Sequence, residues 1–218
     1  MNGPNLSIFD TFKTKKGSLT GEAKRQRQII AALAGQSNPA GRTRTAISQG
    51  IAGKRGKAWK NIYSGIFRDM DETLIPLGLV EEEGRLPLKR GPRALQEQGI
   101  PYYRLTSSGL LVSLSLGEIP GAEGNLKRFL AGDGCGAGVE KALGTVFEAA
   151  PGFAHHLLEG YVRSYCMGER EDLLPLDFEG LKAASDGQVR ILKEFMAGYS
   201  GSNKTGRARL DGFLERIV

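Results

Sequence analysis

The chain of 218 residues has little that would mark a secreted, membrane or metal-binding protein. It contains two cysteines, two histidines and one tryptophan. Two cysteines are too few for the disulfide framework of a small secreted domain. No apolar run approaches the roughly 20 residues that a membrane-spanning helix needs, and the N-terminus lacks the apolar stretch of a signal peptide. We therefore expect a cytoplasmic protein without membrane contact, in which Cys135 and Cys166 are reduced thiols.

Patterns typical of catalytic, nucleotide or metal sites are also lacking. The glycine-rich segment 132–138 has no predicted strand before it, so we interpret it as a flexible turn between helices. Segment 198–206 has Asn203 where a phosphate-binding loop requires glycine. His155 and His156 are adjacent, so on a helix they point about 100° apart and cannot readily hold one metal ion together. We expect no enzymatic activity, no cofactor and no bound metal.

Charge is distributed unevenly along the chain. Residues 1–116 contain 18 lysines and arginines against 9 acidic residues, which gives a formal charge of +9. Residues 117–218 contain 12 against 15, a charge of −3, in agreement with the overall +6. A basic half joined to a mildly acidic half indicates two functional parts, and the basic half is the one that would meet a polyanion. The length suffices for two small domains, each with its own core.

The first 50 residues predict a basic terminus and two helices. Residues 1–18 end in a cluster of lysines and have few apolar side chains, so they form either a mobile basic arm or an ordinary frayed terminus. A cap at Ser18 or Thr20 predicts a helix over 22–35, and residues 45–53 predict a second, shorter one. Ile29, Ile30 and Leu33 should face the core, and Ile47 and Ile51 lie four positions apart in the second helix.

Residues 58–77 form the longest amphipathic stretch of the sequence. Their apolar residues recur every three or four positions, which is the period of one helix face and not of a strand. The apolar series is Trp59, Ile62, Tyr63, Ile66, Phe67, Met70, Leu74 and Leu77. The opposite side carries donors and charges at Lys57, Lys60, Asn61, Ser64, Arg68 and Asp71. That polar side could lie against phosphates and base edges. The helix should stop near Pro76 and Gly78.

Two short strands and a helix cap follow the amphipathic stretch. Leu79 and Val80 begin the first strand, and residues 102–105 make its expected partner. The long segment between them is rich in glycine, proline and basic residues, which is typical of a functional or disordered loop. Thr106 or Ser107 should then cap a closing helix that ends near Gly117.

Beyond a glycine- and proline-rich junction, residues 117–218 read almost entirely as helices. Apolar positions recur with helical spacing and without strand alternation. The predicted segments are 125–132, 138–150, 152–166, 177–185, 187–199 and 207–218. The sequence therefore predicts a mostly α-helical protein with one small β-hairpin.

The order of helix, strand, basic loop, strand and capped helix resembles the winged helix-turn-helix superfamily of transcription regulators, with PadR-like and MarR-like proteins nearest. The resemblance is carried by LIPLGLVEEE at 74–83 and YYRLTSSGLLV at 102–112. It implies a basic arm over 1–18, a winged-helix DNA-binding domain over 19–116 and a helical dimerisation or effector domain over 117–218. In this sequence the recognition helix is longer than usual, and the loop between the strands is larger and contains two prolines.

In proteins of this kind the recognition helix enters the major groove and the wing touches adjacent backbone or minor groove. The resemblance therefore implies a set of DNA contacts from the basic turn, the helix and the wing. These residues are Lys54, Arg55, Lys57, Lys60, Asn61, Ser64, Arg68, Arg85, Lys89, Arg90 and Arg93. A plainer interpretation is that these side chains only solvate a helix face and a loop.

The function expected from the resemblance is binding of double-stranded DNA as a transcription regulator, as a homodimer, with a possible small-molecule or protein effector at the C-terminal helices. One alternative is a winged helix that acts as a protein-interaction module of a larger nucleic-acid complex, with Trp59, Tyr63 and Tyr102 as exposed contacts. Another is a regulatory winged helix attached to a small enzyme or ligand-binding helical domain. A large cavity within residues 120–218 would favour this last alternative.

Overall fold

The computed structural model describes residues 5–15, 17–52, 58–87, 99–117 and 119–217, with side chains undescribed at 58–61 and 217. The described part is mostly helical and contains a single two-stranded antiparallel sheet. None of its helices combines the length and the apolar character needed to cross a membrane. The N-terminal elements are α1 (Gly21–Gly35), α2 (Arg44–Ala52), α3 (Ala58–Arg68), β1 (Val80–Leu86), β2 (Ile100–Leu105) and α4 (Ser107–Ser115). The C-terminal elements are α5 (Ala122–Leu130), α6 (Val139–Ala149), α7 (Pro151–Cys166), α8 (Phe178–Ala184), α9 (Gly187–Gly201) and α10 (Lys204–Ile217).

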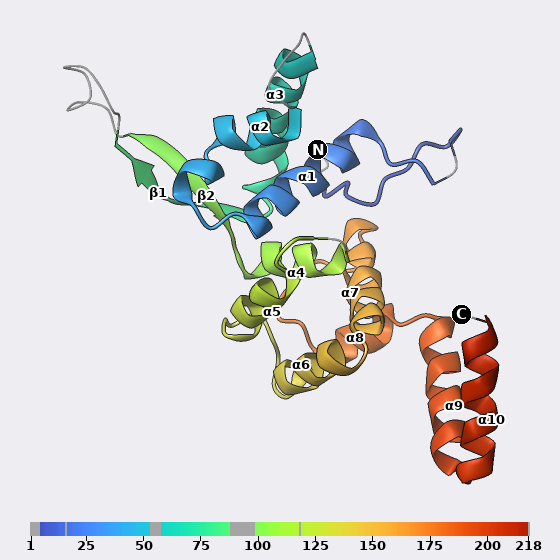
Figure 1. The fold of residues 1–218 in the computed structure, drawn as a ribbon. Helices are drawn as coiled ribbons and strands as arrows, with labels where there is room; N and C mark the ends of the chain where they lie inside the picture. The colour runs from blue at the N-terminus through green and yellow to red at the C-terminus, as the bar shows by residue number, and fades with distance from the viewer. Residues whose placement is uncertain (1–4, 16, 53–57, 88–98, 118, 218) are drawn as a thin grey trace.

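Helix α1 begins where the sequence predicts it. The Thr20 side chain accepts a hydrogen bond from the Ala23 amide at 3.1 Å, which satisfies one of the free N–H groups of the first turn. Its residues Ile29, Ile30 and Leu33 are buried, as expected from their spacing. Helix α1 therefore serves as the central support against which α2, α3 and α4 pack (Figure 1).

The amphipathic stretch is not one continuous α-helix. Helix α3 ends at Arg68 and continues as the π-helix η2 (Asp69–Leu74), which leads through a turn to Gly78. The prediction of one helix over 58–77 is therefore wrong in its second half, although its end near Gly78 is confirmed. Gly78 has a φ of +66°, a conformation that side-chain-bearing residues rarely adopt, so the chain can turn there into β1.

The predicted β-hairpin and closing helix are confirmed. Strands β1 and β2 pair antiparallel, with Val80 opposite Leu105 and a register shift between Glu82 and Gly84. The Thr106 side chain accepts from the Gly109 amide at 3.1 Å and caps α4. A Cβ at Gly109 would lie 2.0 Å from the Leu79 carbonyl oxygen, so only glycine allows α4 to approach the chain leading into β1 this closely.

The N-terminal segment differs from the expected mobile arm. Leu6 and Ile8 are buried, Phe9 is nearly so, and the backbone amide of Ser7 donates to the Gln26 side chain at 2.9 Å. Arg27 and Arg163 lie over the Phe9 ring at 5.3 and 4.4 Å from its centroid. Because these residues belong to the core, the start of the described chain is anchored between α1 and α7.

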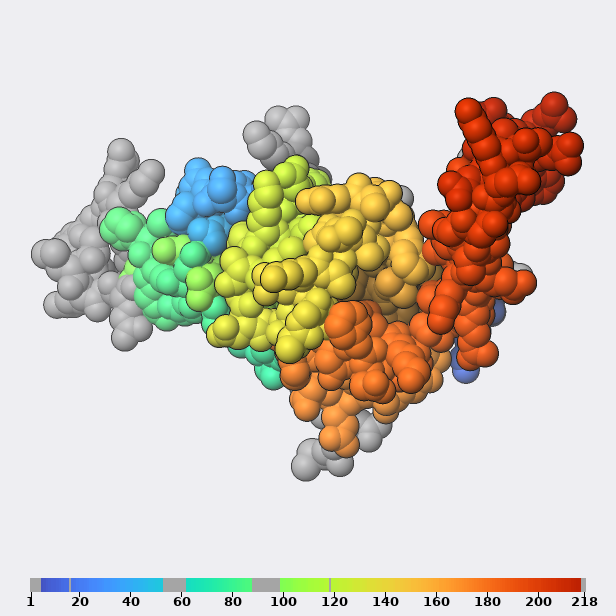
Figure 2. Space-filling view, turned by 90° about the horizontal axis from the view of Figure 1, so that it is seen from below, coloured from blue at the N-terminus to red at the C-terminus, as the bar shows by residue number. Residues whose placement is uncertain are grey.

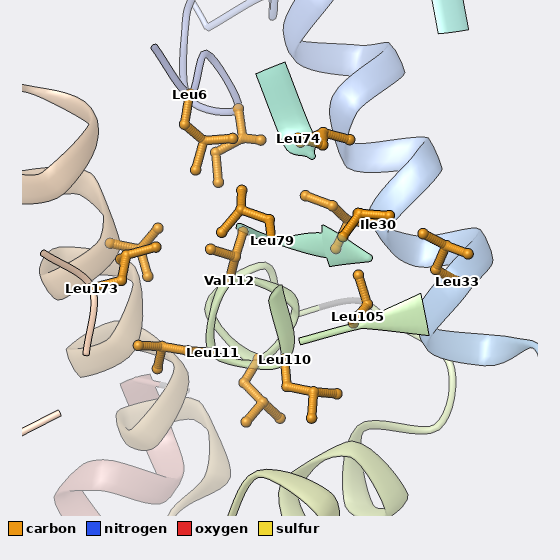
Figure 3. Close-up of a cluster of buried hydrophobic side chains, with 14 of the residues drawn as sticks. Leu6, Ile30, Leu33, Leu74, Leu79, Leu105, Leu110, Leu111, Val112 and Leu173 are labelled. Atoms are coloured by element: carbon orange, nitrogen blue, oxygen red, sulfur yellow. The ribbon is translucent and has the colours of Figure 1, made fainter. Parts of the chain in front are cut away.

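One hydrophobic core extends across the predicted domain boundary at residue 117. Helix α4 lies at its centre, with Leu110, Leu111 and Val112 surrounded by side chains from both halves (Figure 3). On one side α4 packs against α1 and β2, and on the other against α5 and α7. The packing therefore has no break at residue 117, where the predicted domains 19–116 and 117–218 would meet.

The C-terminal helices fall into two groups. Helices α5 to α8 surround the far side of α4, whereas α9 and α10 form a hairpin that projects from the body of the molecule (Figures 1 and 2). No described residue of this hairpin is buried. The six predicted helices are thus confirmed within a few residues. What their periodicity did not predict is that the last two pack mainly on each other.

Segment 132–138 is held in place, unlike the flexible turn that the sequence suggested. The amide of Gly136 donates to the Leu176 carbonyl, and the amide of Leu176 donates to the Gly134 carbonyl, both at 2.8 Å. Cys135, within this segment, and Cys166 in α7 are free thiols. Burial raises the pKa of Cys166 to about 12. That thiol is therefore protonated and unreactive at neutral pH.

Candidate nucleic-acid interface

Helix α3 has an inner side on the core and an outer side in solvent. Ile66 is fully buried, and Met70 and Leu74 of η2 continue the same side. Ser64 and Arg68 are exposed, and we call these two residues the outer side of α3. The start of α3 lies at the end of the molecule opposite α5 to α8, so the C-terminal helices do not cover it (Figure 1).

A buried ion pair ties the inner side to α1. Arg25 donates to both carboxylate oxygens of Asp69, with distances of 2.8 and 3.2 Å, and the Asp69 side chain is only 2% exposed. A Cβ at Gly65 would lie 2.8 Å from Nε of Arg25, so glycine leaves room for the guanidinium to cross the helix. A buried carboxylate needs such a partner, because its desolvation is costly. The pair therefore fixes α3 against α1.

A second arginine ties η2 to α2 and to the hairpin. Arg44 donates to both carboxylate oxygens of Asp71, one of them at 2.8 Å, and its guanidinium lies 5.2 and 5.1 Å from the ring centroids of Phe67 and Tyr103. Burial raises the pKa of Tyr103, and the nearby Arg44 partly opposes that rise. Arg44 thus links the strand β2 to the helical elements through one side chain.

The cations of the hairpin are neutralised by its own glutamates. Arg85 donates to Glu82 at 2.6 and 3.1 Å, and Arg104 donates to Glu81 at 2.6 Å. Arg42, which precedes α2, forms an ion pair with Glu83 and lies over the Tyr102 ring. Each of the three consecutive glutamates of β1 therefore binds one arginine. The described surface of the hairpin carries much less net positive charge than its arginines alone would give.

Arg68 differs from these arginines. It is exposed, and no carboxylate of the described residues forms an ion pair with it. Its neighbours Asp69, which is buried, and Asp71, which is exposed, pair with Arg25 and Arg44. Glu72, four residues after Arg68, is exposed and forms no ion pair with it, so the charge of Arg68 stays available on the outer side of α3.

The structure describes the side chains of three of the eleven predicted DNA-contact residues. Ser64, Arg68 and Arg85 are all exposed, but Arg85 lies on the hairpin and is paired with Glu82. Lys60 and Asn61 lie on α3, and nothing is described of their side chains. The other predicted residues, Lys54, Arg55, Lys57, Lys89, Arg90 and Arg93, lie outside the described residues.

Sequence reasoning missed the arginines that organise this region. Arg25 lies on α1, Arg42 just before α2 and Arg44 at the start of α2, and each binds an acidic residue at least 27 positions away. No local pattern signals such distant pairs. The run of three glutamates in β1 was a usable signal, because three adjacent carboxylates in a short strand need cationic partners nearby.

Two of the aromatic residues considered as exposed protein contacts are partly buried. Tyr63 packs against Phe67, with ring centroids 4.4 Å apart. Tyr102 lies beneath Arg42, and its phenol fills the space beside Gly84. Nothing is described of the third, the Trp59 side chain. Both described rings are therefore engaged within the molecule, although part of each remains accessible.

Comparison with known proteins does not identify a relative. No protein-family model, no curated protein and no solved structure matches this chain. The resemblance to winged-helix regulators therefore stays a prediction, based on residues 74–83 and 102–112 of the sequence.

Proposed function

We propose that this protein binds double-stranded DNA through the outer side of α3 and acts as a transcription regulator. Residues 19–116 would form a winged helix-turn-helix in which α2 and α3 are the paired helices and β1 and β2 the wing. The helices beyond them would serve dimerisation or effector sensing. The homodimer is a prediction from the resemblance, because readers of palindromic sites work in pairs.

One observation carries the proposal: Arg68 on α3 is exposed and forms no ion pair with a described carboxylate, while its neighbours Asp69 and Asp71 pair with Arg25 and Arg44. A cation in this position can replace a counterion on a phosphate, or donate to the edge of a guanine. The basic segment just before α3, with Lys54, Arg55 and Lys57 in the sequence, supports the same surface.

The hairpin has a secondary role in this proposal. Because Arg85 and Arg104 are paired with Glu82 and Glu81, the described strands add little attraction for phosphates. Any wing contact would come from the basic residues Lys89, Arg90 and Arg93 of the connecting segment. The described strands would then position that segment next to the duplex.

The test is binding of a fluorescent duplex, measured by anisotropy for the protein and for Arg68→Gln. Loss of a single groove or phosphate contact should weaken binding by roughly tenfold. Lys141→Gln, an exposed cation on α6, removes the same charge far from α3 and should leave affinity nearly unchanged. Equal affinities for the protein and for Arg68→Gln would remove the outer side of α3 from the interface.

A further inference from the structure

An apolar groove lies between α6, α7, α8 and the first turns of α9. Its volume is about 710 Å³. That is within the range of roughly 300–1,000 Å³ found for small-molecule sites. The groove lies among the C-terminal helices, away from α3 and the β-hairpin. It therefore belongs to a part of the molecule for which the DNA-binding proposal assigns no ligand.

Hydrocarbon side chains from three helices make its wall. Helix α6 contributes Leu143 and Val146, α7 contributes Phe153 and Leu157, and α8 contributes Phe178. The Phe178 side chain is 52% exposed, which is unusual for so large an apolar group. Such a concave and partly solvated apolar surface gains free energy when a hydrocarbon chain displaces its water.

Three cations are among the residues that line the groove. Lys182 of α8 and Arg190 and Lys193 of α9 are lining residues, and no aspartate or glutamate is among the described residues that line it. None of the three forms an ion pair with a described carboxylate. The nearby Asp186 is engaged otherwise, because it caps α9 and contacts His156. The lining thus combines an apolar wall with three cations that have no acidic partner in the part of the chain that the structure describes.

We propose that this groove binds an amphipathic organic anion, namely the carboxylate of an unbranched acyl chain. The chain would lie along the wall formed by α6, α7 and α8, and the carboxylate would meet Lys182, Arg190 and Lys193. A neutral lipid would leave the three cations unused, and a nucleic-acid backbone would leave the wall unfilled. The inference concerns a different surface from the DNA-binding proposal and does not depend on it.

Calorimetric titration of the full chain with octanoate, decanoate and dodecanoate, each kept below its aggregation concentration, tests the site. Each added methylene should raise affinity about fourfold, as expected for burial of one CH₂ group. Dodecanol and dodecyltrimethylammonium have the same chain without the anion and should bind at least about tenfold more weakly. No binding of dodecanoate, or equal binding of the cationic analogue, would overturn the assignment.

Variants locate the binding surface. Combined replacement of Lys182, Arg190 and Lys193 by glutamine should weaken dodecanoate binding by at least about tenfold and leave dodecanol binding unchanged. A control variant replaces three other exposed cations, Lys141, Lys204 and Arg209, by glutamine. It should bind dodecanoate with the affinity of the original protein. Unchanged dodecanoate affinity in the first variant would contradict the proposed anion contact.

Filling the groove provides an independent check. Ala142→Phe and Val146→Phe each add bulk at the wall, from successive turns of α6. Either variant should abolish binding of both dodecanoate and dodecanol, provided that its circular dichroism and thermal transition match those of the original protein. A folded variant that still binds dodecanoate with full affinity would place the ligand elsewhere.

Discussion

Helix α3 and the β-hairpin use arginine–carboxylate pairs in opposite ways. In η2, directly after α3, the buried Asp69 pairs with Arg25 of α1, and the half-exposed Asp71 pairs with Arg44 of α2. On the hairpin the pairs of Arg85 and Arg104 lie in solvent, with all four side chains between 38% and 49% exposed. The first arrangement leaves a cation free on the outside, whereas the second cancels surface charge.

The difference shows that the number of basic residues in a segment does not give its surface charge. The sequence placed basic residues on both the helix and the wing, and both were predicted to contact DNA. The pairing within the structure separates them, because an exposed arginine next to a glutamate offers a phosphate much less than an unpaired arginine does. Arg68 and Arg85 are therefore the informative pair of residues.

The largest expected effect is on stability, at the buried pair beneath α3. Asp69→Asn should lower the free energy of unfolding by about 3 kcal/mol, because it removes the charge partner of a partly buried guanidinium. Chemical denaturation monitored by circular dichroism measures this change. The matched hairpin variant, Glu81→Gln, breaks an exposed pair and should cost less than about 1 kcal/mol. Similar losses in the two variants would show that the two regions are held together in the same way.

The next effect concerns affinity for DNA. Glu82→Gln removes the carboxylate that pairs with Arg85 and should raise duplex affinity by up to about fivefold, since it releases an exposed cation on the wing. Anisotropy titrations at constant salt give the ratio of dissociation constants. If affinity does not change, the hairpin strands lie too far from the duplex for their charge to matter.

The smallest effect is a pH dependence at Tyr103, where the hairpin meets Arg44. Burial raises the pKa of this phenol above its ordinary value of 10.0, so the folded state keeps the proton longer than the unfolded state does. The resulting stability is present below pH 10 and is lost as the pH rises through the folded pKa. Tyr103→Phe should make the alkaline decline shallower by less than about 1 kcal/mol over one pH unit.

Burial also raises the pKa values of Tyr161 and Tyr165. These two phenols should therefore still cause part of the loss of stability at high pH in Tyr103→Phe. Thermal melts between pH 9 and 11 measure the difference between the two proteins. An identical alkaline decline in Tyr103→Phe would show that this phenol does not ionise at the contact between the two regions.

Local signals in the sequence predicted much of the fold. Thr20 and Thr106 cap the helices expected of them, because capping depends on residues three positions apart. The two strands of the hairpin lie where the sequence placed them, on either side of the segment rich in glycine, proline and basic residues, and the apolar series of 58–77 correctly predicted Ile66 and Met70 as core residues. These features are encoded within a few residues of where they appear, so a single sequence reveals them.

Most features that the sequence did not predict depend on distant contacts. The π-helix η2 holds Asp69, whose partner Arg25 lies 44 residues earlier, and no local pattern links the two. Leu6 and Ile8 are buried by contacts with distant elements, α1 and α7. The lysine-rich composition of the terminus gave no sign of these contacts. The neutralisation of Arg85 could have been anticipated, because Glu82 precedes it by three residues in the same strand.

The most direct test of the account is the salt dependence of duplex binding, measured in parallel for the original protein, Arg68→Gln and Arg85→Gln. The slope of the logarithm of affinity against the logarithm of salt concentration counts phosphate contacts, at about 0.9 per contact. Arg68→Gln should lose about one contact from this slope, while Arg85→Gln should keep the original slope. An unchanged slope in Arg68→Gln, or an equal loss in both variants, would contradict the account.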